Sequence, residues 1–147
     1  MNYKNLNKDD LKLIEEARAI IKRHYFPDKH HIGAAIKTTS GKVYTAVHLD
    51  GSVGQCSICA ESIALGKAIS EGDPVPVIVA AVRHPRPQEA DQTIKVVSPC
   101  GRCREIISDF GPDCYLIVPT EDGVKKVSVA ELLPFKYKTR KFAKQDV

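Results

Sequence analysis

Four residues in two short strings have the types and the spacing of a catalytic metal site. One residue separates Cys59 from Glu61, and Cys100 and Cys103 form a Cys-x-x-Cys pair further along the chain. A zinc ion that assists hydrolysis has three protein ligands and an open position for water, and it works with a carboxylate that is not a ligand. The three cysteines supply the ligands and Glu61 supplies the carboxylate. The pattern therefore predicts metal-assisted hydrolysis with one Zn²⁺ per subunit.

A structural zinc site is the alternative interpretation of the same cysteines. Cys56 and Cys59 form a second Cys-x-x-Cys pair, and two such pairs are typical of a closed site with four thiolate ligands. The 40 residues between Cys59 and Cys100 exceed the roughly 15–20 of a compact zinc ribbon. Glu61 also favours the catalytic interpretation. Cys114 is predicted to be a small buried hydrophobic residue in a strand.

Hydrophobic periodicity places these residues on a series of short elements. Helices are predicted over 9–25, 57–70 and 98–110, with a short closing helix at 130–133. Strands are predicted over 32–38, 42–49, 76–83, 93–97, 114–118 and 124–129. This order predicts an α/β fold, a three-layer α-β-α sandwich with a mixed five-stranded sheet. Both Cys-x-x-Cys pairs then fall at helix starts.

The composition predicts one soluble domain over 1–147. The 147 residues are 43% hydrophobic and carry a formal net charge of +4. No stretch reads as a signal peptide or a membrane span, so no membrane partner and a cytoplasmic location are expected. Residues 136–147 form a basic tail that is predicted to be solvated, with contact to phosphates as the alternative.

The strings around the four residues resemble the cytidine deaminase family, including its blasticidin S deaminase branch. The similarity covers 32–134, through IGAAIKTTSGKVYTAV, CAESIALGKAISEG, SPCGRCREIISDF and VAELLP. A Cys or His followed by x-Glu, and later Pro-Cys-x-x-Cys, is the signature of zinc-dependent base deaminases. The resemblance implies hydrolytic deamination of cytosine in a small nucleoside. It also implies a homotetramer whose active sites are completed by neighbouring subunits.

In this interpretation Glu61 carries protons from water to ring N3 and then to the leaving amine. Cytidine or deoxycytidine would become uridine or deoxyuridine, and ammonia would be released. Three thiolates on Zn²⁺ leave a formal charge of about −1. The N-termini of the two helices, together with Arg102 and Arg104, are predicted to offset that charge.

The sequence departs from the family where the sugar is held. The family usually has Asn-x-Glu eleven residues before the first ligand, and this register gives His48-Leu49-Asp50 here. His48, Asp50 and Ala60 are predicted to contact the substrate, and the changed side chains indicate a changed sugar or a non-sugar substituent. Blasticidin S is therefore the alternative substrate.

Two further features leave alternatives open. His30 and His31 replace the aromatic residue that commonly precedes the Gly-Ala strand, and either a surface or a substrate role fits them. A nucleic-acid editor would use the same metal chemistry, but such enzymes commonly have His as the first ligand. Nucleic acid is therefore not expected as a partner.

Overall fold

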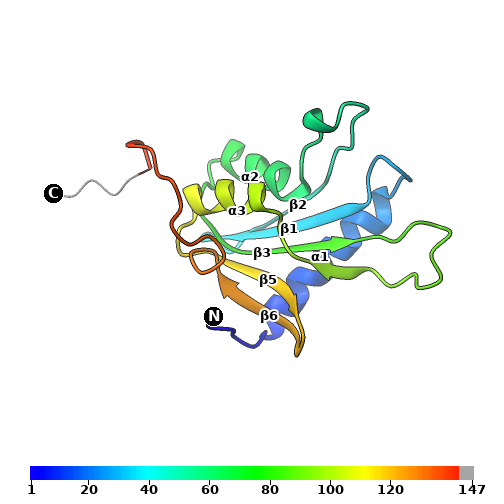
Figure 1. Ribbon diagram of the computed structural model, residues 1–147, viewed down its shortest axis with the longest axis horizontal. Helices are drawn as coiled ribbons and strands as arrows, with labels where there is room; N and C mark the ends of the chain where they lie inside the picture. Colours follow the sequence, from blue (N-terminus) through cyan, green and yellow to red (C-terminus); the bar gives the residue numbers. More distant parts are fainter. Residues whose placement is uncertain (143–147) are drawn as a thin grey trace.

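The computed structural model describes residues 1–142, which form one mixed sheet with helices on both faces (Figure 1). The helices are α1 (Lys8–His24), α2 (Ala60–Ser70) and α3 (Gly101–Phe110), and a 3₁₀ turn, η1, covers Gly54–Cys56. The strands are β1 (Ile32–Thr38), β2 (Val43–Val47), β3 (Pro76–Arg83), β4 (Lys95–Val97), β5 (Tyr115–Thr120) and β6 (Gly123–Ser128).

The sheet is built around β3, whose apolar run VIVAAV suits a strand covered on both faces. The strand order is β2-β1-β3-β5-β6, and β4 also pairs with β3. The β3–β5 pair is parallel, whereas the other pairs are antiparallel. These five strands confirm the predicted mixed sheet, and β4 adds a short sixth strand.

Successive side chains of the sheet point to opposite faces and build two cores. Ile36 and Val79 pack with residues of α2 and α3 on one face. Ala35 and Ala80 pack with residues of α1 on the other face (Figure 1). A Cβ at Gly33 would lie 2.5 Å from the backbone oxygen of Ala17, so glycine is what allows α1 to approach β1 this closely. The three-layer α-β-α prediction is confirmed.

The two helices that follow Cys59 and Cys100 begin later than predicted. The 57–70 prediction was wrong at its start, because Ile58 is extended and pairs with Leu49, so α2 begins only at Ala60. The 98–110 prediction was wrong in the same way. Ser98 precedes Pro99, which disfavours helical backbone at the residue before it, and α3 begins at Gly101.

The predicted closing helix at 130–133 is absent, because this segment forms turns. Leu132 and Leu133 donate their amides to the carbonyls of Val129 and Ala130, which is the short-range bonding of turns. Leu133 also precedes Pro134, where helical backbone is disfavoured. The polypeptide therefore leaves β6 through a compact turn and does not add a fourth helix to the described fold.

The prediction of a solvated basic tail was wrong at Lys136. Its ammonium contacts the carboxylates of Glu105 and Asp109 on α3, and its side chain is only 9% exposed. Lys138, Arg140 and Lys141 are exposed, and the part of the predicted tail at 143–147 lies outside the described residues. Within residues 1–142, none of the helices has the length and apolar character needed to cross a membrane.

Candidate active site

Two of the predicted ligands stand at matching positions on neighbouring helices. Cys59 is the N-cap of α2 and Cys100 is the N-cap of α3, both with extended backbone. Ser, Thr, Asp or Asn usually occupy this position and bond to the first-turn amides. Neither cysteine makes such a bond. Their sulfurs instead lie 3.6 Å apart, which leaves both free to hold a metal.

The third predicted ligand completes a compact sulfur cluster. Cys103 lies in the first turn of α3 and is fully buried. The Sγ atoms of Cys59, Cys100 and Cys103 all lie within 4.8 Å of one another. Sulfurs bound at about 2.3 Å to a tetrahedral zinc ion would be about 3.8 Å apart, so the spacing fits this metal.

A bound cation would also stabilise the deprotonated form of the clustered thiols. Burial raises the pKa of the Cys59 thiol, and burial together with the Glu61 carboxylate raises the pKa of the Cys103 thiol well above its usual range. Thiolates gathered in this position would repel one another, and a bound Zn²⁺ removes that penalty because it stabilises the deprotonated sulfur. The donor set and its surroundings therefore fit one Zn²⁺.

The fourth cysteine of the structural alternative does not join the cluster. Cys56 is exposed in η1, and among residues 1–142 no fourth Cys, His, Asp or Glu joins the three sulfurs as a potential ligand. A four-thiolate site is therefore not formed. Cys114 is 1% exposed and packs in the core on the α2–α3 face of the sheet, as the sequence predicted.

Glu61 lies beside the sulfur cluster. It is the second residue of α2, its side chain is 4% exposed, and its carboxylate is close enough to interact with the Cys103 thiol. Burial raises the pKa of this carboxyl group. A buried carboxylate next to three metal ligands, and not needed as a ligand itself, is suited to carry protons.

One cavity brings most of these groups together, and we call it the catalytic pocket. It has a volume of about 270 Å³ and is lined by Ile32, His48, Cys59, Ala60, Glu61, Val97, Ser98 and Cys100. The predicted substrate contacts His48 and Ala60 are thus present in it. Sequence reasoning missed Ile32, Val97 and Ser98. Their signal was positional, because Ile32 begins β1 and the other two directly precede the Pro-Cys-x-x-Cys string.

His48 lines the catalytic pocket and forms a pair with His31, which lies behind it. Nε2 of His48 lies 2.9 Å from Nδ1 of His31, and the two rings meet edge to face with centroids 4.1 Å apart. His30 donates from Nδ1 to the carbonyl of His48 at 2.8 Å. Burial, followed by the neighbouring His31, lowers the pKa of His48 to about 4. Burial lowers the pKa of His31 as well, so the surroundings favour the neutral form of both imidazoles, and one then donates to the other.

The structure keeps Asp50 and Arg102 outside the lining of the catalytic pocket. Asp50 is exposed and its Oδ1 accepts a hydrogen bond from the hydroxyl of Ser57 at 3.1 Å. Arg102 is also exposed and donates to the carbonyl of Ser57 at 3.4 Å. Both side chains thus hold the segment that leads into Cys59.

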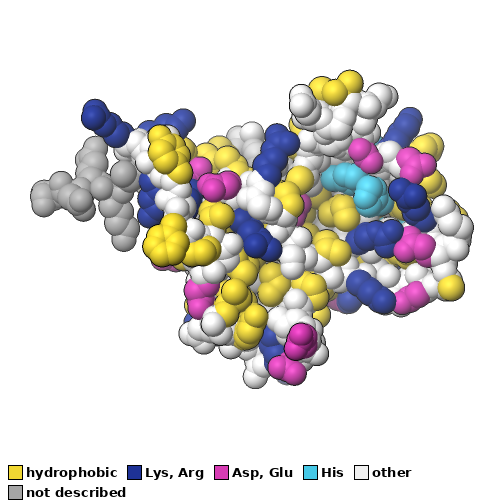
Figure 2. Space-filling model, in the orientation of Figure 1, with side chains coloured by type: hydrophobic (Ala, Val, Ile, Leu, Met, Phe, Trp, Pro, Cys, Tyr) yellow, Lys and Arg dark blue, Asp and Glu magenta, His cyan; other side chains and the backbone are white. Residues whose placement is uncertain are grey.

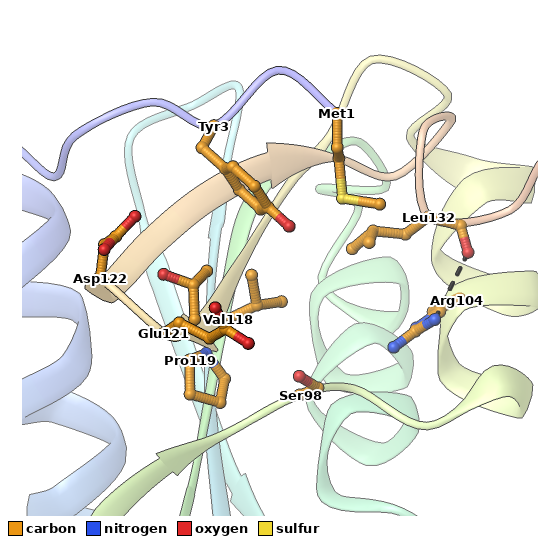
Figure 3. Close-up of a pocket in the computed structure, with 10 residues that line it drawn as sticks. Met1, Tyr3, Ser98, Arg104, Val118, Pro119, Glu121, Asp122 and Leu132 are labelled. Carbon is orange, nitrogen blue, oxygen red and sulfur yellow. Dashed lines mark hydrogen bonds between the residues drawn. The ribbon is translucent and has the colours of Figure 1, made fainter.

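Arg104 points toward a different cavity (Figure 3). Its guanidinium donates to the carbonyls of Pro99 at 2.9 Å and Leu132 at 3.5 Å, so it ties the start of α3 to the turn after β6. The cavity that it lines has a volume of about 820 Å³ and shares Ser98 with the catalytic pocket. Although it is larger, it contains none of the three ligand cysteines and not Glu61.

Comparisons with known proteins agree with this geometry. Residues 7–118 match the family model described as the cytidine and deoxycytidylate deaminase zinc-binding region. The chain is 44% identical to blasticidin-S deaminase of Bacillus cereus over 133 residues, which are 90% of this chain and 95% of that protein. It is 32% identical to cytidine deaminase of Sporosarcina psychrophila over 126 residues, which are 84% of this chain and 87% of that protein.

A solved structure shares the fold. Cytidine deaminase from Mycobacterium tuberculosis superimposes with a TM-score of 0.71 at 23% sequence identity, covering 90% of this chain and 100% of that chain. At this identity the likeness concerns the arrangement of helices and strands. It agrees with the three-layer arrangement, in which the sulfur cluster lies at the N-termini of α2 and α3.

Proposed function

The chain belongs to the cytidine and deoxycytidylate deaminase family, and we propose that it removes the amino group of cytosine in a small nucleoside by hydrolysis. Family membership makes it a zinc-dependent hydrolase, and Cys59, Cys100 and Cys103 are the residues that would hold the metal. The observation that carries the proposal is the catalytic pocket, in which the Glu61 carboxylate lies beside two of the three sulfurs.

The reaction exchanges one substituent on the ring. Zinc, when bound, supplies the acidity that turns a water molecule into a nucleophile at neutral pH. Glu61 accepts the proton from water and passes it to ring N3, and the water oxygen bonds to C4. The C4–N bond then breaks, a second proton reaches the amine through Glu61, and ammonia leaves a uracil ring. Burial of Glu61 keeps bulk water from competing for these protons.

The start of each helix is proposed to offset the charge of the three thiolates. Cys59 and Cys100 are N-caps and Cys103 lies in a first turn, where amide dipoles favour negative charge. Arg102 would add to this effect from the surface. Arg104 acts less directly, because its guanidinium is bonded to backbone carbonyls.

Cytidine and deoxycytidine are the proposed substrates, with His48 and Ala60 against the nucleoside and Asp50 near the sugar side. Blasticidin S is the second candidate. It is favoured by the 44% identity to blasticidin-S deaminase of Bacillus cereus and by His48, which stands where the family usually has asparagine. Both candidates have the same cytosine head and differ in what lies beyond it.

A parallel assay tests the proposal. Purified zinc-containing protein is given cytidine, deoxycytidine, blasticidin S and free cytosine, and loss of the cytosine ultraviolet band is followed together with ammonia release. We expect stoichiometric ammonia from at least one nucleoside and much slower release from free cytosine. If zinc-loaded protein releases ammonia from none of them, the proposed reaction is wrong.

The active unit is proposed to be a homotetramer of single-domain subunits. The apolar side chains of Leu49, Val53 and Ile58 are 46%, 61% and 39% exposed on the segment that leads into Cys59. Apolar exposure next to a site is typical of a surface that another subunit covers. Light scattering after size exclusion would measure the mass, and a monomer with full activity would contradict the proposal.

A further inference from the structure

The segment between β2 and α2 closes on itself just before Cys59. It stands out from the body of the molecule beside α2 (Figure 1), and in the space-filling view it forms a projecting knob with apolar side chains at its tip (Figure 2). Residues 51–56 are all exposed. Exposed loops open at a low cost in free energy. The contacts that close the base of this loop therefore determine how well Cys59 is held.

Cys59 has little to fix it from within its own helix. It is an N-cap with extended backbone, and its side chain makes no cap hydrogen bond. On its C-terminal side the amide of Ile63 donates to the Cys59 carbonyl at 3.2 Å, which joins it to α2. On its N-terminal side its position depends on Ser57 and Ile58.

The residues that follow β2 form the fixed side of the base of the loop. The amide of Asp50 donates to the carbonyl of Lys29 at 3.0 Å, which anchors this side to the segment before β1. Leu49 and Ile58 exchange two backbone hydrogen bonds of 3.0 Å each. This bridge brings the segment that enters α2 against the fixed side.

The side chain of Ser57 adds a second connection to the fixed side, which we call the serine latch. Its hydroxyl donates to Oδ1 of Asp50 at 3.1 Å and accepts from the amide of Gly51 at 3.1 Å. One hydroxyl thus uses its donor and one of its acceptor positions. Only Ile58 lies between Ser57 and Cys59, and both have extended backbone, so a displacement of Ser57 moves Cys59 with it.

The backbone of Ser57 also contacts the second ligand string. Arg102, which lies between Cys100 and Cys103, donates to the Ser57 carbonyl at 3.4 Å. This bond links the two strings outside the sulfur cluster. The sulfurs of Cys59 and Cys100 are 3.6 Å apart, close to the about 3.8 Å expected on a tetrahedral zinc ion. Metal–ligand distances must be met within about 0.2 Å, so a small movement of this segment weakens metal binding.

We propose that Ser57 is a positioning residue of the metal site, and that its bonds to Asp50, Gly51 and Arg102 hold Cys59 where the metal needs it. The inference rests on the proposed function, because it takes Cys59 as a ligand. Ser57 itself is not among the clustered ligands and does not line the catalytic pocket. It acts on the metal only through the position of Cys59.

The serine latch gives Asp50 a second role. Its bond to Ser57 uses Oδ1, which leaves Oδ2 for the sugar side of a substrate. A change at Asp50 should therefore affect both zinc binding and the KM for a nucleoside. A change at Ser57 should affect zinc binding and leave the KM of zinc-saturated protein as it is.

Zinc affinity, measured on the full chain by competition with a colorimetric chelator, tests the proposal without reference to activity. Ser57→Ala removes both bonds of the hydroxyl and should raise the Kd for Zn²⁺ about tenfold, the equivalent of about one net hydrogen bond. Ser57→Thr keeps the hydroxyl and suits extended backbone, so it should restore the affinity. Ser52→Ala, at an exposed serine of the same loop outside the latch, is the matched control and should leave the Kd unchanged.

The visible absorption of Co²⁺-substituted protein separates positioning from a merely structural role. Co²⁺ absorption reports on the geometry of the ligands around the ion, and geometry distinguishes metal sites. Ser57→Ala should alter the Co²⁺ bands, and Ser57→Thr should return them to those of the wild type. A Kd that rises while the bands stay unchanged would leave Cys59 in place and overturn the positioning role.

A double-mutant cycle tests whether Asp50 acts on the metal through Ser57. Asp50→Ala should raise the Kd for Zn²⁺, and the variant with both substitutions should bind zinc no more weakly than Ser57→Ala alone, because both changes break the same bond. If the two effects on the Kd multiply, Asp50 and Ser57 act independently and the latch between them is wrong.

Cys59→Ala distinguishes failure of the latch from failure of the proposed function. If Cys59→Ala loses zinc but Ser57→Ala binds it as tightly as Ser52→Ala does, the latch is wrong and the proposed function stands. If Cys59→Ala retains full zinc affinity, Cys59 is not a ligand, and both the proposed metal site and the latch are wrong.

Discussion

The metal corner and the histidine wall meet at the catalytic pocket, where Cys59, Glu61 and Cys100 of the one face His48 of the other, but they are built in different ways. The metal corner consists of Cys59, Glu61, Cys100 and Cys103, all at the first turns or N-caps of α2 and α3. The histidine wall consists of His30, His31 and His48, which come from the residues before β1 and after β2. Both regions need packing, because Cys59 meets Cys100 from 41 residues away and His48 meets His31 from 17 residues away. Only the corner is marked in the sequence, since each of its halves is a short string at a helix start.

The two regions differ in how freely their side chains can be exchanged. Metal binding tolerates few residue types, so each ligand position of the corner accepts little besides Cys or His. A wall that contacts a sugar or its replacement needs only complementary hydrogen bonds, and several side chains can provide them. The corner therefore determines the reaction, and the wall is the place where substrate preference can change.

Removing a ligand from the corner is expected to have the largest effect. Cys59→Ala should lose zinc. Replacing a residue that only hydrogen-bonds to a metal ligand typically lowers metal affinity about 10–100-fold, and the loss of a ligand should exceed that. Activity should fall to background. Zinc content by mass spectrometry and the deamination rate measure both. Cys56→Ala is the matched control, because Cys56 is three residues away, exposed and outside the sulfur cluster. If Cys56→Ala lost zinc and Cys59→Ala retained it, the assignment of Cys59 as a ligand would be wrong.

Glu61→Gln should separate catalysis from metal binding within the corner. The amide keeps the shape of the side chain but cannot carry protons, so kcat should fall about 10²–10⁴-fold. Zinc content should stay at one per subunit, because Glu61 is not among the clustered sulfurs. Steady-state kinetics on zinc-loaded protein decides the point, and normal ammonia release by this variant would remove Glu61 from the mechanism.

His48→Ala should weaken substrate binding more than it slows the deamination step, unlike the variants of the metal corner. The variant loses the His31 hydrogen bond and one wall of the pocket, so KM should rise about tenfold with a smaller change in kcat. His48→Asn, which restores the amide usual in the family, should recover part of the affinity for cytidine. Zinc content is the control. If His48→Ala changed kcat and left KM unchanged, His48 would act in the chemical step and not in substrate binding.

The smallest expected effect is a pH dependence of stability from the wall. His48 has a pKa of about 4 in the folded protein against 6.5 as its ordinary value, because burial and His31 disfavour the charged form. The unfolded chain therefore binds about one more proton between these values. This contribution is present above pH 6.5 and is lost as the pH falls toward about 4.

Denaturant unfolding at several pH values in this window measures the slope. His48→Gln cannot titrate, so its free energy of unfolding should fall less steeply than that of the wild type. Comparing the two proteins removes the contribution of the metal site, which they share. Equal slopes would show that His48 is not held neutral by its surroundings.

Much of this architecture could be predicted from local patterns. The apolar run of β3 and the periodicity of α1 indicate a buried strand and an amphipathic helix, and both are present. Helix starts were less predictable. Ile58 is extended because it pairs with Leu49, which is nine residues earlier, and no local pattern shows that pairing. Lys136 looked solvated because its partners lie on α3, far away in the chain.

The sequence alone predicted the metal site, and the structure brings its three cysteines together. Three cysteines and a glutamate at these spacings allow few other interpretations, since zinc restricts the type, number and charge of its ligands. Only the tertiary structure decided what surrounds that chemistry. It brought His31 to His48 and stacked the ring of Tyr25 on that of His84 beside them. Hydrogen bonds between segments distant in the chain depend on how the layers pack, and residue spacing carries no record of that packing.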